Sequence, residues 1–211
     1  MFTFVLSASL TGLMLGGCGH STSSAQATSV AELTDDQKYA LAYMWNEEKL
    51  AKDIYLALYD TWEGDTLTLY NIATQSETRH IETVEGLVEA YDINITNLDD
   101  YNDSYSEAEL RALDAGEYAI AELQELYNTL YAEGNASEQE ALQVGCKVEV
   151  KDIADLNESI AIAEGVDDLV GAFELLRLQS YQHYKEISDT LRSIGVTEGC
   201  CVLGDAYCLD Q

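Results

Sequence analysis

The sequence contains no proline in 211 residues and only 3 phenylalanines. Proline interrupts helix interiors because it lacks a backbone N–H and its ring clashes with the preceding turn. A chain without proline can therefore run in long helices. Tyrosine is abundant instead, with 14 copies, and a tyrosine can line a core while its hydroxyl reaches a polar partner.

Basic residues are also scarce. Ten Lys and Arg stand against 39 Asp and Glu, which gives a formal net charge of −29. A surface of this sign repels phosphate backbones and anionic lipid, so nucleic-acid binding is excluded. It suits cations, salty surroundings or a cationic partner, and solubility in salty water is the simplest explanation. Because 47% of the residues are hydrophobic, we expect a globular domain rather than a disordered acidic chain.

The N-terminal residues 1–17 (MFTFVLSASLTGLMLGG) are apolar and end in small residues. Their length is typical of a signal-peptide core and short for a membrane span. The run LGGC at residues 15–18 resembles a bacterial lipobox, which implies lipidation of Cys18, although no Lys or Arg precedes it. We therefore expect a signal peptide over 1–18, a polar tether over 19–32 and an exported envelope lipoprotein. It would face the periplasm or the cell exterior and touch the membrane only through its lipid anchor. An ordinary cleaved signal or a buried apolar segment is the alternative.

Four more cysteines, Cys146, Cys200, Cys201 and Cys208, follow. Their number is even, and an exported protein can form disulfides. We expect a disulfide that joins the tail, residues 196–211, to itself or to Cys146. A second metal or redox site is the alternative, but the spacing is not a usual zinc pattern.

Helical periodicity recurs over residues 33–195. It predicts long helices over about 34–63, 66–91, 137–164 and 167–194, with a further helix over about 106–133. Thr34, Ser106 and Ser137 are each followed three residues later by Gln or Glu, the pattern of a capping box. No strand-like alternation exceeds a few residues. The predicted fold is therefore all-α, a four-helix bundle with an extra helix inserted between its second and third helices.

An acidic loop separates the second long helix from the inserted helix. Asp99, Asp100 and Asp103 offer oxygen ligands for calcium. The twelve-residue calcium pattern with its central glycine is missing, so we expect a solvated loop.

Six charged or imidazole side chains interrupt the apolar faces of the long helices, and such positions are the informative exceptions in a buried stripe. They are Glu48 in the first helix, Glu77 and His80 in the second, Glu149 and Asp152 in the third, and His183 in the last. Buried carboxylates repel one another unless a cation neutralises them. Carboxylates and imidazoles from facing helices are ligands of a dinuclear iron or manganese site. The alternative is that His80 lies at the surface and that Glu149 and Asp152 are solvated.

Four motifs in order carry a resemblance to a known family. They are residues 46–55 (NEEKLAKDIY), 76–80 (SETRH), 148–156 (VEVKDIADL) and 180–183 (SYQH). The set resembles the ferritin-like family of domain of unknown function 2202 (DUF2202), over about residues 33–194, which is distantly similar to rubrerythrin-type diiron proteins. The resemblance implies a ferritin-like bundle whose metal ligands are Glu48, Glu77, His80, Glu149, Asp152 and His183.

One position departs from the rubrerythrin pattern. Such sites carry Glu three residues before the histidine of the last helix, and Ser180 stands there. One bridging carboxylate is therefore missing, and Glu186, one turn away, is the nearest substitute. A mononuclear or asymmetric site fits as well as a dinuclear one.

Two functional hypotheses follow. The first is a metal-dependent oxidase or peroxidase of the envelope that reacts with dioxygen or peroxide, or oxidises ferrous iron, with Tyr55 as a nearby phenol and Cys146 one turn before Glu149. A rubredoxin-like pair of Cys-x-x-Cys motifs is absent, so a partner or thiols would supply electrons. The second is a binding or scaffold protein with a degenerate metal site, whose acidic face docks a cationic partner. A homodimer is compatible with both, since ferritin-like bundles often pair.

Overall fold

The computed structural model describes residues 32–96 and 105–209, and this part of the chain contains helices and no strand. The predicted signal peptide with Cys18, nearly all of the tether and the acidic loop around Asp99 lie outside the described residues. Among the described helices, none has both the length and the apolar composition needed to cross a bilayer. The predicted all-α class is confirmed.

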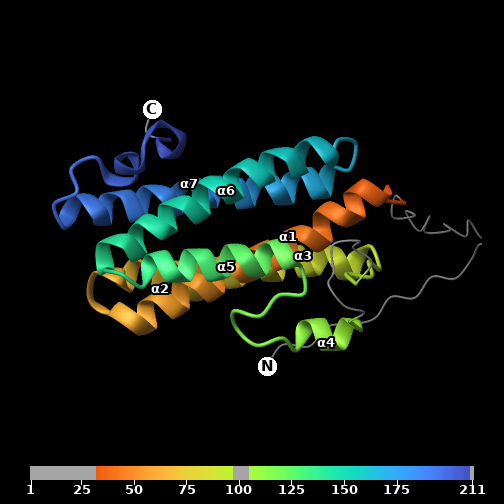
Figure 1. Cartoon of the computed structure of the whole chain (residues 1–211). Helices are drawn as coiled ribbons and strands as arrows, with labels where there is room; N and C mark the ends of the chain where they lie inside the picture. Colours follow the sequence, from red (N-terminus) through yellow and green to blue (C-terminus); the bar gives the residue numbers. More distant parts are fainter. Residues whose placement is uncertain (1–31, 97–104, 210–211) are drawn as a thin grey trace, which may run out of the picture. The chain divides into compact units, whose positions relative to one another are not determined.

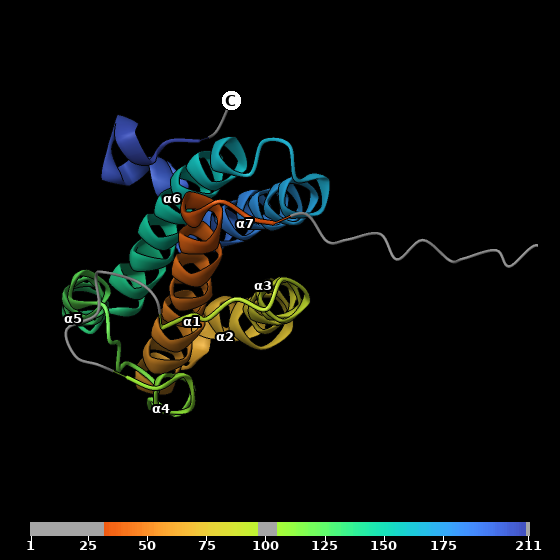
Figure 2. The same ribbon diagram turned by 90° about the vertical axis from the view of Figure 1, so that its right-hand side faces the viewer.

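Four long helical stretches form the frame of the molecule. They are α1 (Asp35–Trp62); α2 (Leu67–Ile72), which continues through a π-helical segment (Ala73–Glu77) into α3 (Thr78–Ala90); α6 (Glu138–Ile162); and α7 (Asp167–Ser193). Helices α6 and α7 lie side by side along most of their length, and α1 packs against α2, α3 and α6 (Figures 1 and 2). These contacts bury one face of each stretch.

The ends of these helices follow local sequence rules. At the start of α1, the Thr34 hydroxyl accepts from the backbone N–H of Gln37, and the Gln37 side chain accepts from the Thr34 N–H. This is the predicted capping box, which satisfies two backbone donors that the helix leaves unpaired. Helix α6 begins after Ser137, whose hydroxyl accepts from the Glu140 N–H. Helix α7 is followed by Gly195 at φ +102°, a conformation that glycine adopts without strain.

The predicted helix over residues 106–133 was wrong as a single helix. The structure has a short α4 (Glu107–Arg111), then a non-helical stretch, then α5 (Ala121–Gly134). Within the stretch, Gly116 adopts φ +82° and its N–H donates to Asp53 of α1 at 3.0 Å. The Tyr118 hydroxyl donates to the same Asp53 oxygen at 2.8 Å. These long-range hydrogen bonds override helical propensity, and periodicity along the chain cannot reveal them.

Helix α5 covers the seam between α1 and α6 (Figure 2). At its C-terminal end the Gly134 carbonyl accepts from the Trp62 indole N–H at 2.9 Å. A Cβ on Gly134 would lie 2.6 Å from Leu58 of α1, so glycine permits this close approach. Lys147 of α6 and Glu133 of α5 form an ion pair at 2.6 Å. The inserted helix is therefore fixed to both of its neighbours.

The C-terminal tail is held by two disulfides. Cys146 of α6 is bonded to Cys200, and Cys201 is bonded to Cys208. The first joins the tail to α6 and the second closes a short loop within the tail, so the tail contains both kinds of link expected from the sequence. All four sulfurs are used in these bonds, which leaves no thiolate for the alternative of a tail metal site.

Candidate metal centre

All six sequence-predicted ligands lie in the interior. Their relative exposures range from 1% to 5%: Glu48, Glu77, His80, Glu149, Asp152 and His183. The alternative of a surface His80 with solvated Glu149 and Asp152 is therefore wrong. Ionisable groups so deeply buried need partners, because removing a charge from water is costly.

Five of the six form two overlapping groups of three. In the first, Nδ1 of His80 lies 3.0 Å from Oε2 of Glu48 and 2.9 Å from Oε2 of Glu77. In the second, Nδ1 of His183 lies 3.0 Å from Oε1 of Glu77 and 3.5 Å from Oε2 of Glu149. Within each group the potential ligand atoms lie within 4.8 Å of one another. Glu77 belongs to both groups and turns one oxygen toward each imidazole.

The outer nitrogens of both histidines are also engaged. Nε2 of His80 lies 3.1 Å from the side-chain oxygen of Gln179, and Nε2 of His183 lies 2.7 Å from the Ser76 hydroxyl. Such outer hydrogen bonds fix the orientation of an imidazole whose other nitrogen faces a metal. Sequence reasoning missed both partners, since Ser76 and Gln179 carry no periodic signal beyond being adjacent to Glu77 and Ser180.

Tyr55 occupies the position expected of a nearby phenol. It is fully buried, and its hydroxyl donates to Oε1 of Glu149 at 2.5 Å. Burial and the neighbouring charge of Glu149 raise the pKa of Tyr55 well above its usual value, so it stays protonated and remains a donor. The phenol thus leaves Oε2 of Glu149 to face His183.

The π-helical segment Ala73–Glu77 lies directly at the site. A π segment inserts an extra residue into a helical turn, and such segments are frequent at functional sites. Here its last two residues are Ser76 and Glu77, which contact the two histidines. The Thr78 hydroxyl donates to the Ala73 carbonyl at 3.1 Å, which gives this carbonyl of the widened turn a hydrogen-bond partner.

Without a bound cation, protons on the two histidines offset the negative charge of the buried carboxylates. Burial alone would lower the pKa of each histidine, but Glu48 and Glu77 raise that of His80 to about 12, and Glu149 and Glu77 raise that of His183 to about 10. Burial raises the pKa of Glu48 to about 7 against the opposing effect of His80. Burial would also raise the pKa of Glu77, but the two histidines hold it well below its usual range. Two imidazolium groups thus stand where cations would bind.

Asp152 lies beside the two groups but not within them. Its Oδ2 accepts from the Ser180 hydroxyl at 2.5 Å, and its Oδ1 is buried without a hydrogen-bond partner among the described residues. Oε1 of Glu48 is buried and unpartnered in the same way. Burial and the charges of Glu48, Glu47 and Glu149 raise the pKa of Asp152 well above its usual value. Glu186, the nearest substitute for the missing glutamate, is exposed and is therefore wrong for that role.

Glu47, which is adjacent to Glu48, faces another partner. It is 5% exposed, and its Oε1 lies 2.9 Å from the ammonium of Lys151 on α6. Burial, together with a hydrogen bond to Asp155, raises the pKa of Glu47 well above its usual value. Glu48, not Glu47, is therefore the residue of this pair that faces the histidines.

The comparisons with known proteins concern the helical part of the chain. The family model described as an uncharacterized protein domain (DUF2202) matches residues 37–200. The chain belongs to the DUF2202 family. The matched part of this DUF2202 chain includes all six predicted ligands together with Tyr55, Ser76 and Gln179.

A relative and a solved structure extend this result. The uncharacterized protein MJ0754 of Methanocaldococcus jannaschii is 32% identical over 165 residues, which cover 77% of this chain and 79% of the relative. The crystal structure of the hypothetical protein MJ0754 from Methanococcus jannaschii superposes with a TM-score of 0.65 at 31% identity, over 78% of this chain and 85% of that one. This DUF2202 chain therefore shares its helical fold with a solved archaeal protein.

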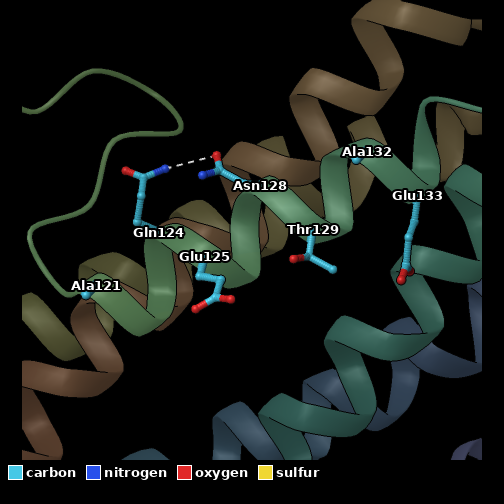
Figure 3. Close-up of a pocket in the computed structure, with 7 residues that line it drawn as sticks. All are labelled: Ala121, Gln124, Glu125, Asn128, Thr129, Ala132 and Glu133. Carbon is cyan, nitrogen blue, oxygen red and sulfur yellow. Dashed lines mark hydrogen bonds between the residues drawn. The ribbon is translucent and has the colours of Figure 1, made fainter.

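A hollow with a volume of about 610 Å³ lies on the surface of α5, away from the buried Glu and His groups. Figure 3 shows that the side chains lining it project from the single helix α5: Ala121, Gln124, Glu125, Asn128, Thr129, Ala132 and Glu133. Binding sites usually bring polar groups from several elements together around a cavity. The hollow lacks that convergence, so the buried Glu and His groups remain the candidate site.

Proposed function

We propose that this protein is a ferritin-like metal-binding protein, in which the four long helical stretches form a bundle around a dinuclear iron or manganese site. The observation that carries the proposal is the position of Glu77. Its two carboxylate oxygens lie 2.9 and 3.0 Å from Nδ1 of His80 and His183. A carboxylate shared in this way by two sets of nitrogen and oxygen donors fits a bridging ligand between two cations.

The donor set fits iron or manganese. It consists of carboxylate oxygens and imidazole nitrogens, without thiolates, which favours these metals over the softer ions that cysteine selects. The buried, unpartnered Oε1 of Glu48 and Oδ1 of Asp152 also favour a cation. An unpaired buried carboxylate oxygen is costly, and a bound ion would remove that cost.

The residues divide into two sets of ligands. Glu48 and His80 would hold one ion, Glu149 and His183 the other, and Glu77 both. Asp152 would be the sixth ligand, because its carboxylate is anchored by Ser180 at the position where the rubrerythrin pattern carries a glutamate. The bound metal would supply one-electron redox chemistry toward dioxygen, peroxide or ferrous iron. Ser76, Gln179 and Tyr55 would orient the ligands.

The proposal also includes a location and an electron source. The apolar N-terminus and the lipobox-like run before Cys18 support export to the bacterial envelope, with membrane contact through a lipid anchor alone. Because Cys146, Cys200, Cys201 and Cys208 form disulfides, electrons would come from a partner molecule. A homodimer is compatible with this role.

One observation favours a second candidate function. Ser180 replaces a glutamate, and Asp152 lies outside the two groups of close ligand atoms. A site weakened in this way would suit a non-enzymatic scaffold or binding protein that docks a cationic partner on its acidic surface.

Metal analysis separates the two functions. Protein purified without chelator, and reconstituted anaerobically with ferrous iron, is expected to hold about two metal equivalents by mass spectrometry. His80→Ala and His183→Ala should each lose bound metal, because each removes the only imidazole of one group. His20→Ala, in the predicted tether, is the matched control and should keep the wild-type content. A wild-type protein with no stoichiometric metal would rule out the redox function and leave the scaffold.

A further inference from the structure

A small pocket lies where α5 meets α1 and α6. Its volume is about 30 Å³. Its apolar wall consists of Leu50 and Ala51 from α1, Leu126 and Leu130 from α5, and Val148 from α6. Leu126 is partly exposed, whereas the other four are buried. The pocket therefore runs inward from the partly exposed edge of α5.

Asp152 connects this pocket with the proposed metal centre. Asp152 is one of the residues that line the pocket, and its Oδ1 is buried without a hydrogen-bond partner among the described residues. Its Oδ2 is bonded to Ser180 of α7. Asp152 follows Glu149 by three residues on α6, and Ser180 precedes His183 by three on α7, so each lies on the same helix face as a proposed ligand. Because Asp152 is itself the proposed sixth ligand, the inner end of the pocket lies beside the proposed site.

The outer end is flanked by two lysines. Lys147 and Lys151 both line the pocket, and their side chains are 28% and 32% exposed. They are two of only ten basic residues in the chain. Each is paired, Lys147 with Glu133 and Lys151 with Glu47. A metal cation gains nothing by approaching here when most of the surface is acidic, so the pocket suits an uncharged molecule.

The volume limits the size of that molecule. One water-sized molecule needs about 10–15 Å³ of such space, so this pocket has room for about two heavy atoms. Its wall is mostly apolar, and the polar groups at its inner end are carboxylates. These properties match a neutral oxidant with two heavy atoms, such as dioxygen or hydrogen peroxide, and exclude an organic hydroperoxide.

We propose that this pocket is the route by which dioxygen or hydrogen peroxide reaches the metal centre, and that the inserted helix α5 sets its size limit through Leu126. The inference rests on the proposed function and adds to it the path of entry and a size limit for the oxidant. Dioxygen and hydrogen peroxide are both small and uncharged, which are the properties that the pocket selects, and the experiment distinguishes them.

The first arm of the test changes the width of the pocket. In the iron-loaded protein, Leu126→Trp is expected to slow oxidation of bound ferrous iron by about tenfold or more with the oxidant that uses the route. Asn128→Trp, at an exposed position of α5 that does not line this pocket (Figure 3), is the matched control and should react at the wild-type rate. Leu126→Ala should admit tert-butyl hydroperoxide, which the wild type should reject. Separate measurements with dioxygen and with hydrogen peroxide show which oxidant reacts more slowly with Leu126→Trp than with the wild type, and therefore which one uses the route.

The second arm does not depend on bound metal. Xenon occupies small apolar cavities, so crystals of metal-free wild-type protein under xenon pressure should show it between Leu50, Leu130 and Val148. The same crystals of Leu126→Trp should not. A wild-type pocket without xenon, or wild-type rates in a Leu126→Trp protein that excludes xenon, would overturn the route. If Leu126→Trp has normal iron content and the wild-type oxidation rate, the route is wrong but the proposed function stands. If the wild type binds no iron, both the proposed function and the route are wrong.

Discussion

At the residue scale, the Glu77 carboxylate is shared by the two imidazoles that most need a counter-charge. Its oxygens lie 2.9 Å from His80 and 3.0 Å from His183. In the metal-free protein this arrangement stabilises the protonated forms, and the pKa values of His80 and His183 rise to about 12 and about 10. A metal must displace those protons, because only a neutral imidazole binds a cation.

The first prediction follows from this competition. Each histidine has a higher pKa when folded than its ordinary value of 6.5, so the folded metal-free protein binds more protons than the unfolded chain above that pH. The stability that this contributes is complete below pH 6.5 and declines above it; the share of His183 is gone once the pH passes about 10, and that of His80 once it passes about 12. As the pH rises over the same range, protons also compete less with the metal for the imidazole nitrogens. The gap between the melting temperatures of metal-loaded and metal-free protein should therefore widen from about pH 6 to pH 9.

Differential scanning fluorimetry at constant ionic strength, with chelator or with metal, measures this gap. The large negative charge affects both forms alike, so their difference reports the site. The double variant His80→Ala with His183→Ala, which lacks the imidazole of both groups, is the control and should show no gap at any pH. A gap that narrows as the pH rises would contradict the assignment of the histidines as ligands.

The second prediction concerns the phenol. Tyr55→Phe removes the only hydroxyl hydrogen bond described for Glu149, the one at 2.5 Å to its Oε1. Removing a partner that orients a metal ligand costs about 10- to 100-fold in metal affinity, and we expect a loss of that size in chelator competition. Tyr181→Phe, on the exposed face of α7, is the matched control. Equal affinities in the two variants would show that Tyr55 only packs.

The buried Glu and His residues of the candidate site could be predicted from the sequence, whereas the side chains that support them could not. His80 and His183 are imidazoles on apolar helix faces, a signal that needs no knowledge of the partner helix. Ser76 and Gln179 are ordinary helix residues until the structure brings them opposite the histidines. Asp152 was predicted as a ligand from its position on α6, but its bond to Ser180 depends on how α6 and α7 pack.

At the element scale, helix starts and ends were easier to predict than the interruptions between them. The capping residues Thr34, Ser106 and Ser137 act within one turn of the chain, and all three cap helices in the structure. The break between α4 and α5 depends on hydrogen bonds to Asp53, which lies 63 residues from Gly116. The π-helical segment also has no local sequence signal such as proline or glycine. The first interruption results from tertiary contacts, which periodicity along the chain cannot reveal.

The third prediction compares the two disulfides. The chain-entropy effect of a cross-link grows with the loop it closes. The Cys146–Cys200 bond spans 54 residues and the Cys201–Cys208 bond spans 7. Replacing the first pair by alanine should lower the free energy of unfolding by about 4 kcal/mol, and replacing the second by about 2 kcal/mol.

Urea unfolding of the two double variants measures this difference. Each variant serves as the control for the other, since both remove one bond from the same tail. A larger loss from Cys201→Ala with Cys208→Ala would mean that the tail is stabilised by its own loop rather than by its attachment to α6.

At the scale of the whole molecule, charge repulsion opposes the compact state. A formal charge of −29 is carried by a chain with ten basic residues. Several of these bases are used in pairs that join helices, as with Lys147 and Glu133 between α6 and α5 or Lys151 and Glu47 between α6 and α1. Most acidic groups thus have no cation of the protein's own, and dissolved cations must supply the screening.

The last prediction is that salt stabilises the metal-free protein. Raising the sodium chloride concentration from 0.01 to 0.15 M shortens the screening length from about 30 Å to about 8 Å, so the melting temperature should rise by several degrees. Changing the exposed Glu125 and Glu174 to lysine removes two negative charges and adds two positive ones, which makes the net charge of −29 less negative by about four units. This double variant should melt higher at low salt and gain less from added salt. The corresponding glutamine variants change the net charge by half as much, so their melting temperatures should lie between those of the wild type and the lysine variant.

Sodium sulfate at the same ionic strength should raise the melting temperature by the same amount as sodium chloride if screening is the cause. A melting temperature that falls as salt is added would show that the internal ion pairs outweigh the repulsion between the surface carboxylates.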